Sequence, residues 1–454
     1  MTTAGLHRYR GMLDDGFRQR QRDGTTPILV ATPRPRIVVL GAGFAGLRAV
    51  RILARAGQHV VWLDARNYHT FLPLLYQVAT AGLEPQAIVY PTRSFLRHFP
   101  DVEFRLERVA SGDPAARVLV TDDGGRISYD QLIVATGGAA ADFGVAGVRE
   151  HAFHLYDVED ARVLRNHVLE QLERAAVLPD GPERRTRLTI VIVGGGPTGV
   201  ETAGALAEFR RHVLPNDYRT IPPDYLRIVL VEARDAVLGT FAEPLRERAL
   251  RDLQAFGVDV RLATSVDRVS SDGVDLAGGE HLAAATVVWA AGIRAGHVAE
   301  RLGLPTGRAG RIRVQPTLEV VGHPGIFAAG DVAIVDGAEG LPQVAQVAMQ
   351  GGAHAARNVL HRLRGEPLAP FVYRDKGAMA TIGRSRAIAE IGRLHLTGAL
   401  AWWVWLLLHL VMLVGFRNRL VVLVNWAWSY LTYDHGLRAI IGARNGHRAP
   451  SLAD

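Results

Sequence analysis

The sequence predicts an α/β protein with two Rossmann-like units and a pair of apolar helices near the C-terminus. Two observations predict this fold. A β-rich run that closes on a glycine loop occurs twice, as RIVVLGAGFAGLR at 36–48 and as TIVIVGGGPTGVE at 189–201. In addition, no charged residue stands between Arg393 and Arg417. With 454 residues, the chain is long enough for two or three domains, each with its own core.

The composition fits a globular α/β chain and excludes several classes of function. Hydrophobic residues make up 48% of the chain and 48 residues are glycine, as expected for many tight strand-to-helix turns. The net charge is +7, but the sequence has no aromatic-basic alternation and no zinc-finger spacing, so we expect an anionic membrane surface as a partner and no nucleic acid. Cysteine is absent, which excludes a disulfide framework, a thiolate metal site and a redox-active dithiol. We expect no metal site.

The N-terminal residues 1–34 differ from the rest of the chain. They mix Arg, Asp, Gly and Pro and lack the apolar core of a secretory signal. We therefore expect a flexible cytoplasmic tail there, without a role in the chemistry.

Each glycine loop has the GxGxxG spacing of a dinucleotide-binding turn. In this motif the first glycine permits a tight turn, the second lets the backbone approach a pyrophosphate, and the third lets the helix pack on the strand. The N-terminus of the helix then faces the phosphates with unpaired N–H groups. A single loop of this kind also occurs as a βα turn without a ligand, so its repetition matters. The glycines are Gly41, Gly43 and Gly46 in the first copy and Gly194, Gly196 and Gly199 in the second.

A second feature is repeated at a matching distance from each loop. A strand-like run closes on a small-residue turn in both copies, as LIVATGG and as VVWAAGI. Gly137 in the first turn lies 96 residues after Gly41, and Gly292 in the second lies 98 residues after Gly194. An internal duplication is stronger evidence than either loop alone. It predicts that this one chain binds two dinucleotides.

An acidic residue follows each loop where it can accept a hydrogen bond from a ribose hydroxyl. Asp64 stands in HVVWLDARN, 23 residues after Gly41, and Glu232 stands in RIVLVEARD. A carboxylate at Glu232 would repel the 2′-phosphate of NADPH, so we favour NADH at the second loop. Arg234 nearby weakens this preference.

The order of these features predicts a discontinuous first domain. It comprises residues 35–154 and 300–365, and a second domain at 155–299 interrupts it. The run IFAAGDVAIV at 326–335 would supply a strand and turn that close the first domain. Asp331 in this run can approach the sugar-like chain of a cofactor. A helix N-cap is the alternative role for Asp331.

Several longer strings carry a family resemblance. They are RNYHTFLPLLYQVATAGL, IFAAGDVA, LPQVAQVAMQGG and the apolar AWWVWLLLHLVMLVGFRNRL. Together they resemble the type II NADH:quinone oxidoreductases, the single-subunit non-pumping NADH dehydrogenases, and the last string looks like the actinobacterial branch. The resemblance covers residues 35–435, and the AQxAxQ string is its most specific part. Gly351 and Gly352 follow that string where relatives often carry a bulkier polar residue, which puts the width of the quinone entry in question.

The resemblance implies the fold of the pyridine nucleotide-disulfide reductases, with FAD on the first unit and NADH on the second. A hydride would pass from NADH to FAD, and two electrons would then reduce a membrane quinone, menaquinone or ubiquinone, in a respiratory chain without proton pumping. The resemblance also implies a homodimer that is peripheral on the cytoplasmic face of the inner (plasma) membrane. By motif position, FAD would contact Gly41, Gly43, Gly46, Asp64, Thr80, Thr136, Gly137, Gly330 and Asp331. NADH would contact Gly196, Gly199, Glu232 and Gly292.

The resemblance also implies four residues near the quinone: Glu201, Gln346, Gln350 and Lys376. Because quinone reduction takes up two protons, polar or ionisable groups should stand near the acceptor. Gln346 and Gln350 are four residues apart and would share one helix face, and a solvated or backbone-capping pair is the alternative. For Glu201 the alternative is an acidic side chain in the first turn of a helix. Lys376 is the only lysine in the chain, and its compact ammonium could approach a flavin carbonyl, whereas a surface lysine without a role is the alternative.

Residues 366–454 are expected to associate with a membrane. The 23-residue uncharged run is long enough to span a bilayer. However, His409 near its centre and the three tryptophans within 402–405 favour two helices that lie in the membrane interface. A buried core or a dimer interface is the alternative use of these helices.

Other functions share parts of this pattern. A soluble NADH-dependent reductase of ferredoxin or rubredoxin has two dinucleotide sites but needs no apolar pair at the C-terminus. A membrane flavoprotein that acts only as a redox sensor would need no AQxAxQ string. Disulfide reductases and sulfide:quinone reductases work through cysteines, which this chain lacks.

Overall fold

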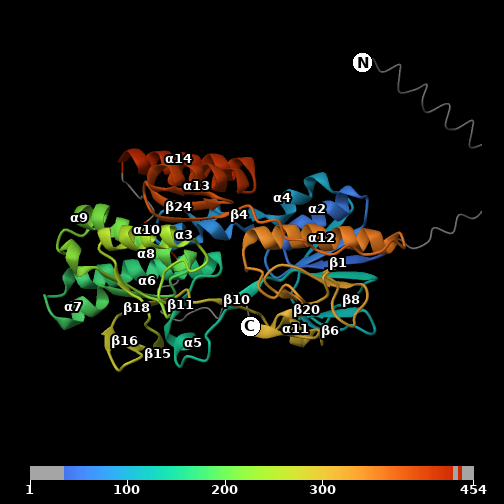
Figure 1. Cartoon of the computed structure of the whole chain (residues 1–454), viewed down its shortest axis with the longest axis horizontal. Coiled ribbons are helices and arrows are strands. Elements are labelled where there is room, and N and C mark those ends of the chain that lie inside the picture. The colour runs from blue at the N-terminus through green and yellow to red at the C-terminus, as the bar shows by residue number, and fades with distance from the viewer. Residues whose placement is uncertain (1–34, 433–437, 442–454) are drawn as a thin grey trace, which may run out of the picture. The chain divides into compact units, whose positions relative to one another are not determined.

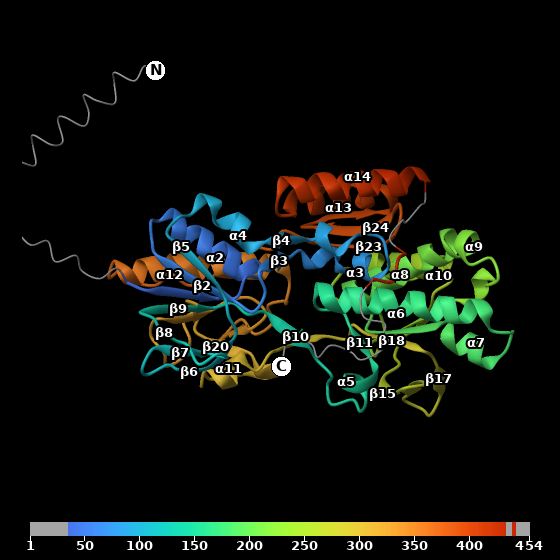
Figure 2. The same cartoon turned by 180° about the vertical axis from the view of Figure 1, so that it is seen from behind.

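The computed structural model describes residues 35–432 and 438–441. The tail expected at 1–34 lies outside the described residues, as do 433–437 and 442–454 of the expected membrane-associated region. Figure 1 and Figure 2 show the described elements from two opposite sides.

Five parallel strands form the first sheet, in the order β21-β9-β1-β2-β5. The backbone of Ile37 in β1 lies between Val60 and Gln131 of its two neighbours. β21 pairs with β9 although almost 200 residues separate them, so the segment near residue 326 returns to the first sheet. All four side chains of β1 are buried, which explains its uninterrupted apolar sequence. The strands are β1 Ile37–Leu40, β2 Val60–Asp64, β5 Val102–Leu106, β9 Gln131–Val134 and β21 Ile326–Ala328.

The second sheet repeats the first strand for strand, in the order β11-β18-β12-β13-β14. The strand before each glycine loop, β1 or β12, is the central strand of its sheet. The strands are β11 Phe153–His154, β12 Thr189–Val193, β13 Arg227–Val231, β14 Asp259–Arg261 and β18 Thr286–Trp289. The predicted pair of Rossmann-like units is therefore confirmed.

Each sheet is covered by helices on one face and by a small antiparallel sheet on the other. Along β12, the side chains of Ile190 and Ile192 join the core beneath the helices. Val191 and Val193 alternate with them and join the core against the small sheet. The covering helices are α2 Phe44–Arg55 and α12 Ala345–Leu363 on the first sheet, and α6 Val158–Val177, α8 Pro197–His212 and α10 Glu243–Ala255 on the second. The small sheets are β6 Val109–Asp113, β7 Val118–Thr121 and β8 Arg126–Ser128, and β15 Val266–Ser270, β16 Gly273–Leu276 and β17 His281–Ala283.

Two connecting strands carry the chain from the first unit to the second and back. β10 (Gly138–Ala140) and β19 (Ile293–Ala295) pair antiparallel, and both views of the ribbon place β10 between the two sheets. Short elements complete the two units: β3 Tyr68–Thr70, α3 Leu75–Ala79, β4 Val89–Pro91, α4 Thr92–Phe95, α5 Val148–His151, α7 Pro182–Arg187, α9 Leu214–Asp217, α11 Val298–Arg301, β20 Ile312–Val314 and β22 Ala333–Val335.

The C-terminal region is a three-stranded antiparallel sheet followed by two helices. Its elements are β23 Ala378–Gly383, β24 Arg386–Ile391, β25 Leu394–Thr397, α13 Gly398–Met412 and α14 Phe416–Thr432. The long uncharged run is thus divided between β25, α13 and the turn that follows. Arg419 at the start of α14 donates to the carbonyl oxygens of Leu413 (2.8 Å) and Val411 (2.8 Å), which caps the end of α13. Among the residues that the structure describes, no helix combines the length and apolarity needed to cross a bilayer.

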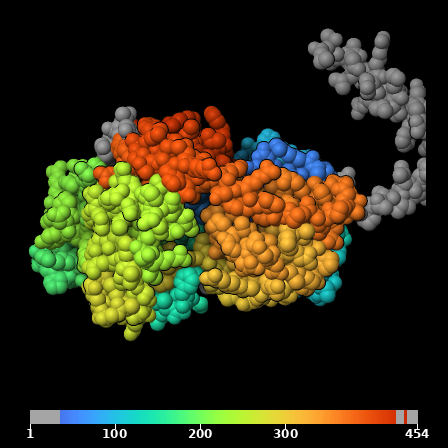
Figure 3. All heavy atoms as spheres, viewed as in Figure 1, coloured from blue at the N-terminus to red at the C-terminus, as the bar shows by residue number. Residues whose placement is uncertain are grey.

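The two C-terminal helices leave large apolar side chains at the surface. On α13 these are Leu400, Trp403, Leu407 and Val411, and on α14 they include Leu420, Val424 and Trp428. The space-filling view shows the two red helices as one outer surface (Figure 3). Each helix therefore buries one face and exposes an apolar face on the other side.

Helices α2 and α12 approach each other closely at Gly352. A Cβ on Gly352 would lie 2.1 Å from the carbonyl oxygen of Ala45, so only glycine fits there. Gly351 is also buried, near Ala329 and Gly330. The departure from relatives at these two positions therefore bears on helix packing, which the sequence did not indicate.

We expect Gly352→Ala to destabilise the protein by about 1–3 kcal/mol, because the added methyl group forces α12 away from α2. The midpoint and slope of unfolding in urea would measure this change. Gly340→Ala is the matched control, because a Cβ there meets no atom within 4 Å and the backbone is not left-handed. Equal stabilities of the two variants would contradict the prediction.

Candidate functional site

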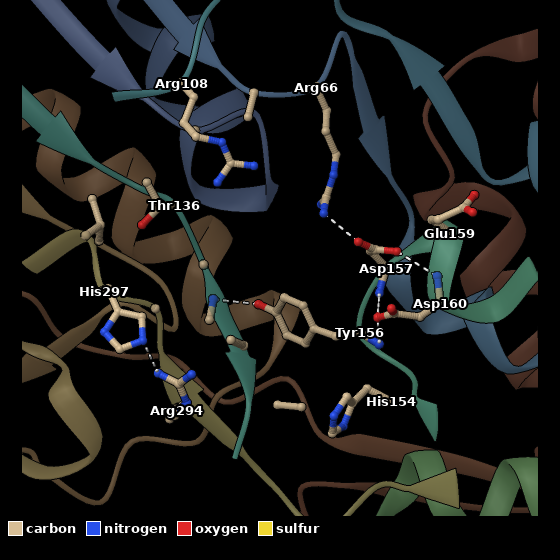
Figure 4. Close-up of a pocket in the computed structure, with 18 of the residues that line it drawn as sticks. Arg66, Arg108, Thr136, His154, Tyr156, Asp157, Glu159, Asp160, Arg294 and His297 are labelled. Carbon is tan, nitrogen blue, oxygen red and sulfur yellow. Dashed lines mark hydrogen bonds and ion pairs between the residues drawn. The ribbon is translucent and has the colours of Figure 1, made fainter. Parts of the chain in front are cut away.

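A cavity of about 920 Å³ opens at the carboxyl ends of the first sheet's strands. Four of the predicted residues line it: Gly41, Asp64, Thr136 and Gly137. They come from the ends of β1, β2 and β9, the edge at which open α/β sheets bind ligands. Figure 4 shows the cavity between these strand ends and the segment that begins α6.

The first glycine loop has the geometry of a ligand cradle. Gly41 has φ +111°, and a Cβ there would lie 2.3 Å from the carbonyl oxygen of Ala135. A Cβ on Gly46 would lie 1.9 Å from the carbonyl oxygen of Gly41. By contrast, a Cβ on Gly43 would meet no atom within 4 Å. Two glycines are therefore required by packing, and the middle one leaves open space where a pyrophosphate would approach the backbone.

The second loop has the same geometry. Gly194 has φ +112°, and a Cβ on Gly199 would lie 1.9 Å from its carbonyl oxygen. A Cβ on Gly196 would again meet no atom within 4 Å. Both loops thus fit a dinucleotide by the same test.

The acidic residue of the first unit braces its loop. The Asp64 carboxylate accepts hydrogen bonds from the backbone N–H of Ala42 (2.5 Å) and of Arg66 (2.7 Å). Burial raises the pKa of Asp64, and these two N–H groups partly offset the rise. Each carboxylate oxygen keeps a second lone pair, so a ribose hydroxyl can still donate to Asp64.

Glu232 braces the glycine loop of the second unit in the same way. Its carboxylate accepts from the backbone N–H of Gly195 (2.5 Å) and of Arg234 (2.8 Å). The duplication therefore extends to single hydrogen bonds. The sequence carries its signature, since an acid-Ala-Arg triplet occurs in both LDARN and VEARD.

Sequence reasoning missed two side chains of the cavity, Arg66 and Tyr156. Arg66 forms an ion pair with Asp157 (2.5 Å), the residue that caps the N-terminus of α6. The hydroxyl of Tyr156 accepts a hydrogen bond from the N–H of Gly138 (2.6 Å). Burial, and then the charge of Asp331, raises the pKa of Tyr156, so the hydroxyl keeps its proton as a donor. The repeated acid-Ala-Arg triplet is a signal in the sequence that could have identified Arg66, whereas no spacing in the sequence indicates Tyr156.

The other predicted residues of the first unit lie beyond the lining of this cavity. The Thr80 hydroxyl donates to the carbonyl oxygen of Tyr76 (2.9 Å) and so serves the end of α3. Gly330 has φ +84°, and a Cβ there would lie 3.4 Å from the Cβ of Ala45, near the start of α2. Burial raises the pKa of Asp331, and the Arg311 guanidinium partly offsets the rise. Gly330 and Asp331 therefore lie near the first glycine loop, and the Thr80 hydroxyl keeps its acceptor lone pairs for a ligand.

Glu201 lies on α8, against the C-terminal sheet. Its carboxylate accepts from the N–H of Thr381 in β23 (3.3 Å). A Cβ on Gly204 would lie 2.0 Å from the carbonyl oxygen of Ile382, so backbone contact holds α8 against this strand. Although part of the side chain reaches solvent, its carboxyl is surrounded by protein, and this burial raises the pKa of Glu201 to about 8. Glu201 therefore carries a proton at neutral pH, which an ordinary acid of a first helical turn does not.

The two predicted glutamines bind the backbone of one neighbouring segment. The Gln346 amide donates to the carbonyl oxygen of Gly377 (3.0 Å), and the Gln350 amide donates to that of Arg374 (2.9 Å). Lys376 lies in this segment and is exposed. The geometry is that of the backbone-capping pair. Within residues 35–432 and 438–441, however, the buried amide oxygen of Gln346 has no hydrogen-bond donor, so it can accept from a ligand.

Aromatic residues connect α3 to the two C-terminal helices. Trp426 donates to the side-chain oxygen of Gln77 (2.9 Å), and Gln77 donates to the Tyr76 hydroxyl (2.9 Å). Trp405 is buried against Tyr76 and stacks on His409 at 4.0 Å. Burial lowers the pKa of His409 to about 4, so this ring is neutral. Trp405 is therefore part of the core and His409 packs against it, so these two side chains do not form the exposed apolar face of α13.

The paired sheets and paired glycine loops define an oxidoreductase of the two-dinucleotide class. The family described as pyridine nucleotide-disulphide oxidoreductase matches residues 35–352, and the NDH2 C-terminal domain matches residues 376–433. A type II NADH:quinone oxidoreductase of Mycobacterium tuberculosis, Ndh, is 38% identical over 89% of this chain and 89% of its own. A second one from the same organism, NdhA, is 39% identical over 90% of this chain and 89% of its own. The chain belongs to the type II NADH:quinone oxidoreductases.

Solved structures support the same fold. The NDH2 of Plasmodium falciparum has a TM-score of 0.81 at 19% identity and covers 90% of this chain and 100% of its own. The sulfide:quinone oxidoreductase of Aquifex aeolicus has a TM-score of 0.68 at 18% identity and covers 88% of this chain and 96% of its own. The fold is thus shared with enzymes of other specificity, as the sequence indicated.

We expect Gly43→Ala to lower FAD retention by about tenfold or more, because the new methyl group occupies the space left for the pyrophosphate. Stability of the apoprotein should change by less than about 1 kcal/mol, since no protein atom is displaced. The ratio of flavin to protein absorbance after gel filtration measures retention.

Gly196→Ala is the matched control in the second loop, where the same open space occurs. This variant should keep its FAD, and it should need a higher NADH concentration for half-maximal bleaching of the flavin. A Gly43→Ala protein that retains FAD at one per chain would contradict the assignment.

Proposed function

We propose that the chain transfers a hydride from NADH to FAD and then reduces a membrane quinone to quinol without pumping protons. The observation that carries this proposal is the pair of equivalent glycine loops, each with a braced acid, in a chain of this family. Bound FAD would supply the chemistry that accepts a hydride and releases electron pairs. The protein's own residues bind and orient FAD, NADH and the quinone, and they protonate the reduced quinone.

In this proposal the first unit holds FAD. The helix N-terminus of α2 and the open backbone at Gly43 take the pyrophosphate. Asp64 accepts from the ribose, and Thr136 and Gly137 line the same cavity. Gly330 and Asp331 approach from the turn between β21 and β22, beside the first turn of α12, toward the rest of the cofactor. We assign residues 35–154 and 300–365 to this FAD-binding domain.

The second unit, residues 155–299, holds NADH. Gly196 and Gly199 give the pyrophosphate access to the N-terminus of α8, and Gly292 borders the same loop. Glu232 accepts from the adenosine ribose. Because Glu232 is an anion held by two N–H groups, a 2′-phosphate beside it would be repelled, which favours NADH over NADPH.

The quinone is reduced where α8, α12 and the segment 374–377 meet the C-terminal sheet. Glu201 holds a proton there at neutral pH and can deliver it to the reduced quinone. The free amide oxygen of Gln346 can accept from a ligand, and Gln350 fixes the segment that carries Lys376. The exposed Lys376 ammonium can approach an anionic oxygen without the planar shape of guanidinium.

The C-terminal helices give the quinone access from a membrane. The apolar outer faces of α13 and α14 lie on one surface, and the chain is cationic, which suits an anionic lipid surface. We therefore propose that residues 366–454 hold a homodimer peripherally on the cytoplasmic face of the inner (plasma) membrane, where menaquinone or ubiquinone is the acceptor. A soluble ferredoxin or rubredoxin reductase would have no use for this apolar surface. A redox sensor without catalysis would have no use for a protonated buried Glu201.

The proposal is tested with protein purified in detergent. The yellow protein should bleach at 450 nm on anaerobic addition of NADH, and a short-chain quinone should restore the colour at a rate that supports turnover. A colourless protein that does not take up FAD, or bleached protein that no quinone reoxidises, would reject it.

We expect quinone-driven reoxidation to slow as the pH rises through about 8, because Glu201 then loses the proton it delivers. Glu201→Gln should slow this step about 100-fold and remove its pH dependence, with flavin bleaching by NADH retained. Stopped-flow absorbance at several pH values separates the two half-reactions. Glu208→Gln is the matched control, since it changes a second buried carboxyl of α8, bound to the N–H of Arg384. Full quinone turnover in Glu201→Gln with normal FAD content would show the proton-donor role to be wrong.

The raised pKa of Glu201 also predicts how the stability of the protein changes with pH. Between the unfolded pKa of about 4.3 and the folded pKa of about 8, only the folded state keeps the Glu201 proton. Stability must therefore fall as the pH rises through this window. Glu201→Gln should lack this decline and be more stable than the parent protein at pH above about 8. Unfolding midpoints at several pH values would reveal it.

A further inference from the structure

Phe143 combines two unusual properties. Its side chain is 68% exposed, although it stands in a structured loop between β10 and α5. Its φ is +52°, in the left-handed region that bulky side chains rarely adopt. Such backbone strain persists only where the surrounding structure imposes it, and it concentrates at ligand clamps and active sites. The position therefore calls for an explanation.

Hydrogen bonds fix the Phe143 loop to the turn after β18. The N–H of Ala141 donates to the carbonyl oxygen of Gly292 (3.0 Å), and the Trp289 indole donates to the carbonyl oxygen of Ala141 (2.6 Å). On its other side the loop is closed by Asp142, which pairs with Arg149 and accepts from the N–H of Gly144 (3.2 Å). The aromatic ring is thus presented by a rigid frame.

The ring lies against the turn that adjoins the second glycine loop. A Cβ on Gly292 would lie 2.8 Å from Cζ of Phe143, so the ring rests on the backbone of this glycine. One residue earlier, Cα of Ala291 lies 2.7 Å from where Gly194 would carry a Cβ. The ring is therefore next to the turn that touches the second glycine loop.

The first unit offers an internal comparison. Its equivalent turn glycine is Gly137, and an aromatic side chain covers it too, because the Tyr156 hydroxyl lies 3.0 Å from where a Cβ would be. Tyr156 is tied by its hydrogen bond to Gly138. Phe143 has no polar group, and most of its ring faces solvent. Only an apolar contact with something that binds there can use that face.

We propose that Phe143 is a binding residue of the second dinucleotide site, whose ring packs on the nicotinamide ring of NADH beside the Gly292 turn. This inference rests on the proposed function. The loop N–H groups take the pyrophosphate, and Glu232, after β13, takes the adenosine ribose. The Gly292 turn follows β18, on the other side of β12, so the dihydronicotinamide is the end of the dinucleotide that the Phe143 ring can hold. Phe143 thereby contributes affinity for NADH over fragments that lack nicotinamide.

The test compares NADH with ADP-ribose, which lacks the nicotinamide ring, on detergent-purified holoprotein. In Phe143→Ala, the NADH concentration for half-maximal flavin bleaching should rise about tenfold, the loss expected for one aromatic contact. The dissociation constant of ADP-ribose, measured by calorimetry, should stay within about twofold. Phe143→Tyr should restore the NADH value. Quinone-driven reoxidation of the flavin should be unchanged.

Phe143→Gly separates the loss of the aromatic contact with NADH from any effect on folding. Glycine adopts the left-handed backbone without strain, so this variant should unfold at the same temperature or higher and still bind NADH as weakly as Phe143→Ala. Val177→Ala, at another highly exposed apolar residue, is the control. It should change neither the unfolding temperature nor the NADH concentration for half-maximal bleaching.

Unchanged half-saturation in Phe143→Ala or Phe143→Gly would overturn the inference, as would an equal loss of ADP-ribose binding. If NADH does not bleach the flavin of the unmodified protein, the proposed function is overturned, and the inference with it.

Discussion

The architecture depends on backbone contacts too close for any side chain. In each unit the first glycine of the loop touches the turn after a neighbouring strand, and the third touches the first. A Cβ on any of these four glycines would lie 1.9–2.6 Å from a carbonyl oxygen. These contacts fix the loop against the sheet and aim the N–H groups of the following helix at one point. The acids Asp64 and Glu232 then hold the loops by two N–H groups each. Binding geometry is set before any ligand arrives.

Helix α8 links the nucleotide loop to the C-terminal region. Its first turn carries Gly199, two residues later stands Glu201, and Gly204 lies directly on the backbone of β23. A shift of this helix would move the dinucleotide loop and the protonated carboxyl together. The same rigid element therefore serves both half-reactions of the proposed cycle, with the loop on one end and the proton donor beside the C-terminal sheet.

The C-terminal helices separate apolar side chains by face. Inward, Trp405 and Trp426 pack on α3, and His409 stacks on Trp405 as an uncharged imidazole. Outward, the aliphatic and tryptophan side chains have no cover from the described residues. Because apolar area is costly in water, the outer face favours contact with lipid, whereas the inner face stabilises the fold. In the proposed membrane-bound enzyme, one apolar segment thus has two uses.

Local pattern alone determined the two Rossmann-like units, because strand periodicity, glycine spacing and acid placement are properties of short segments, and their repetition excludes chance. The family resemblance singled out Glu201 and the Gln346–Gln350 pair. Tertiary structure decided what these groups do. The pKa of Glu201 depends on burial beneath β23, and the glutamine amides bind a segment 24 to 31 residues away. Trp405, Tyr156 and Phe143 acquire their surroundings from distant parts of the chain, and no spacing in the sequence encodes which face of a helix or loop those parts will cover.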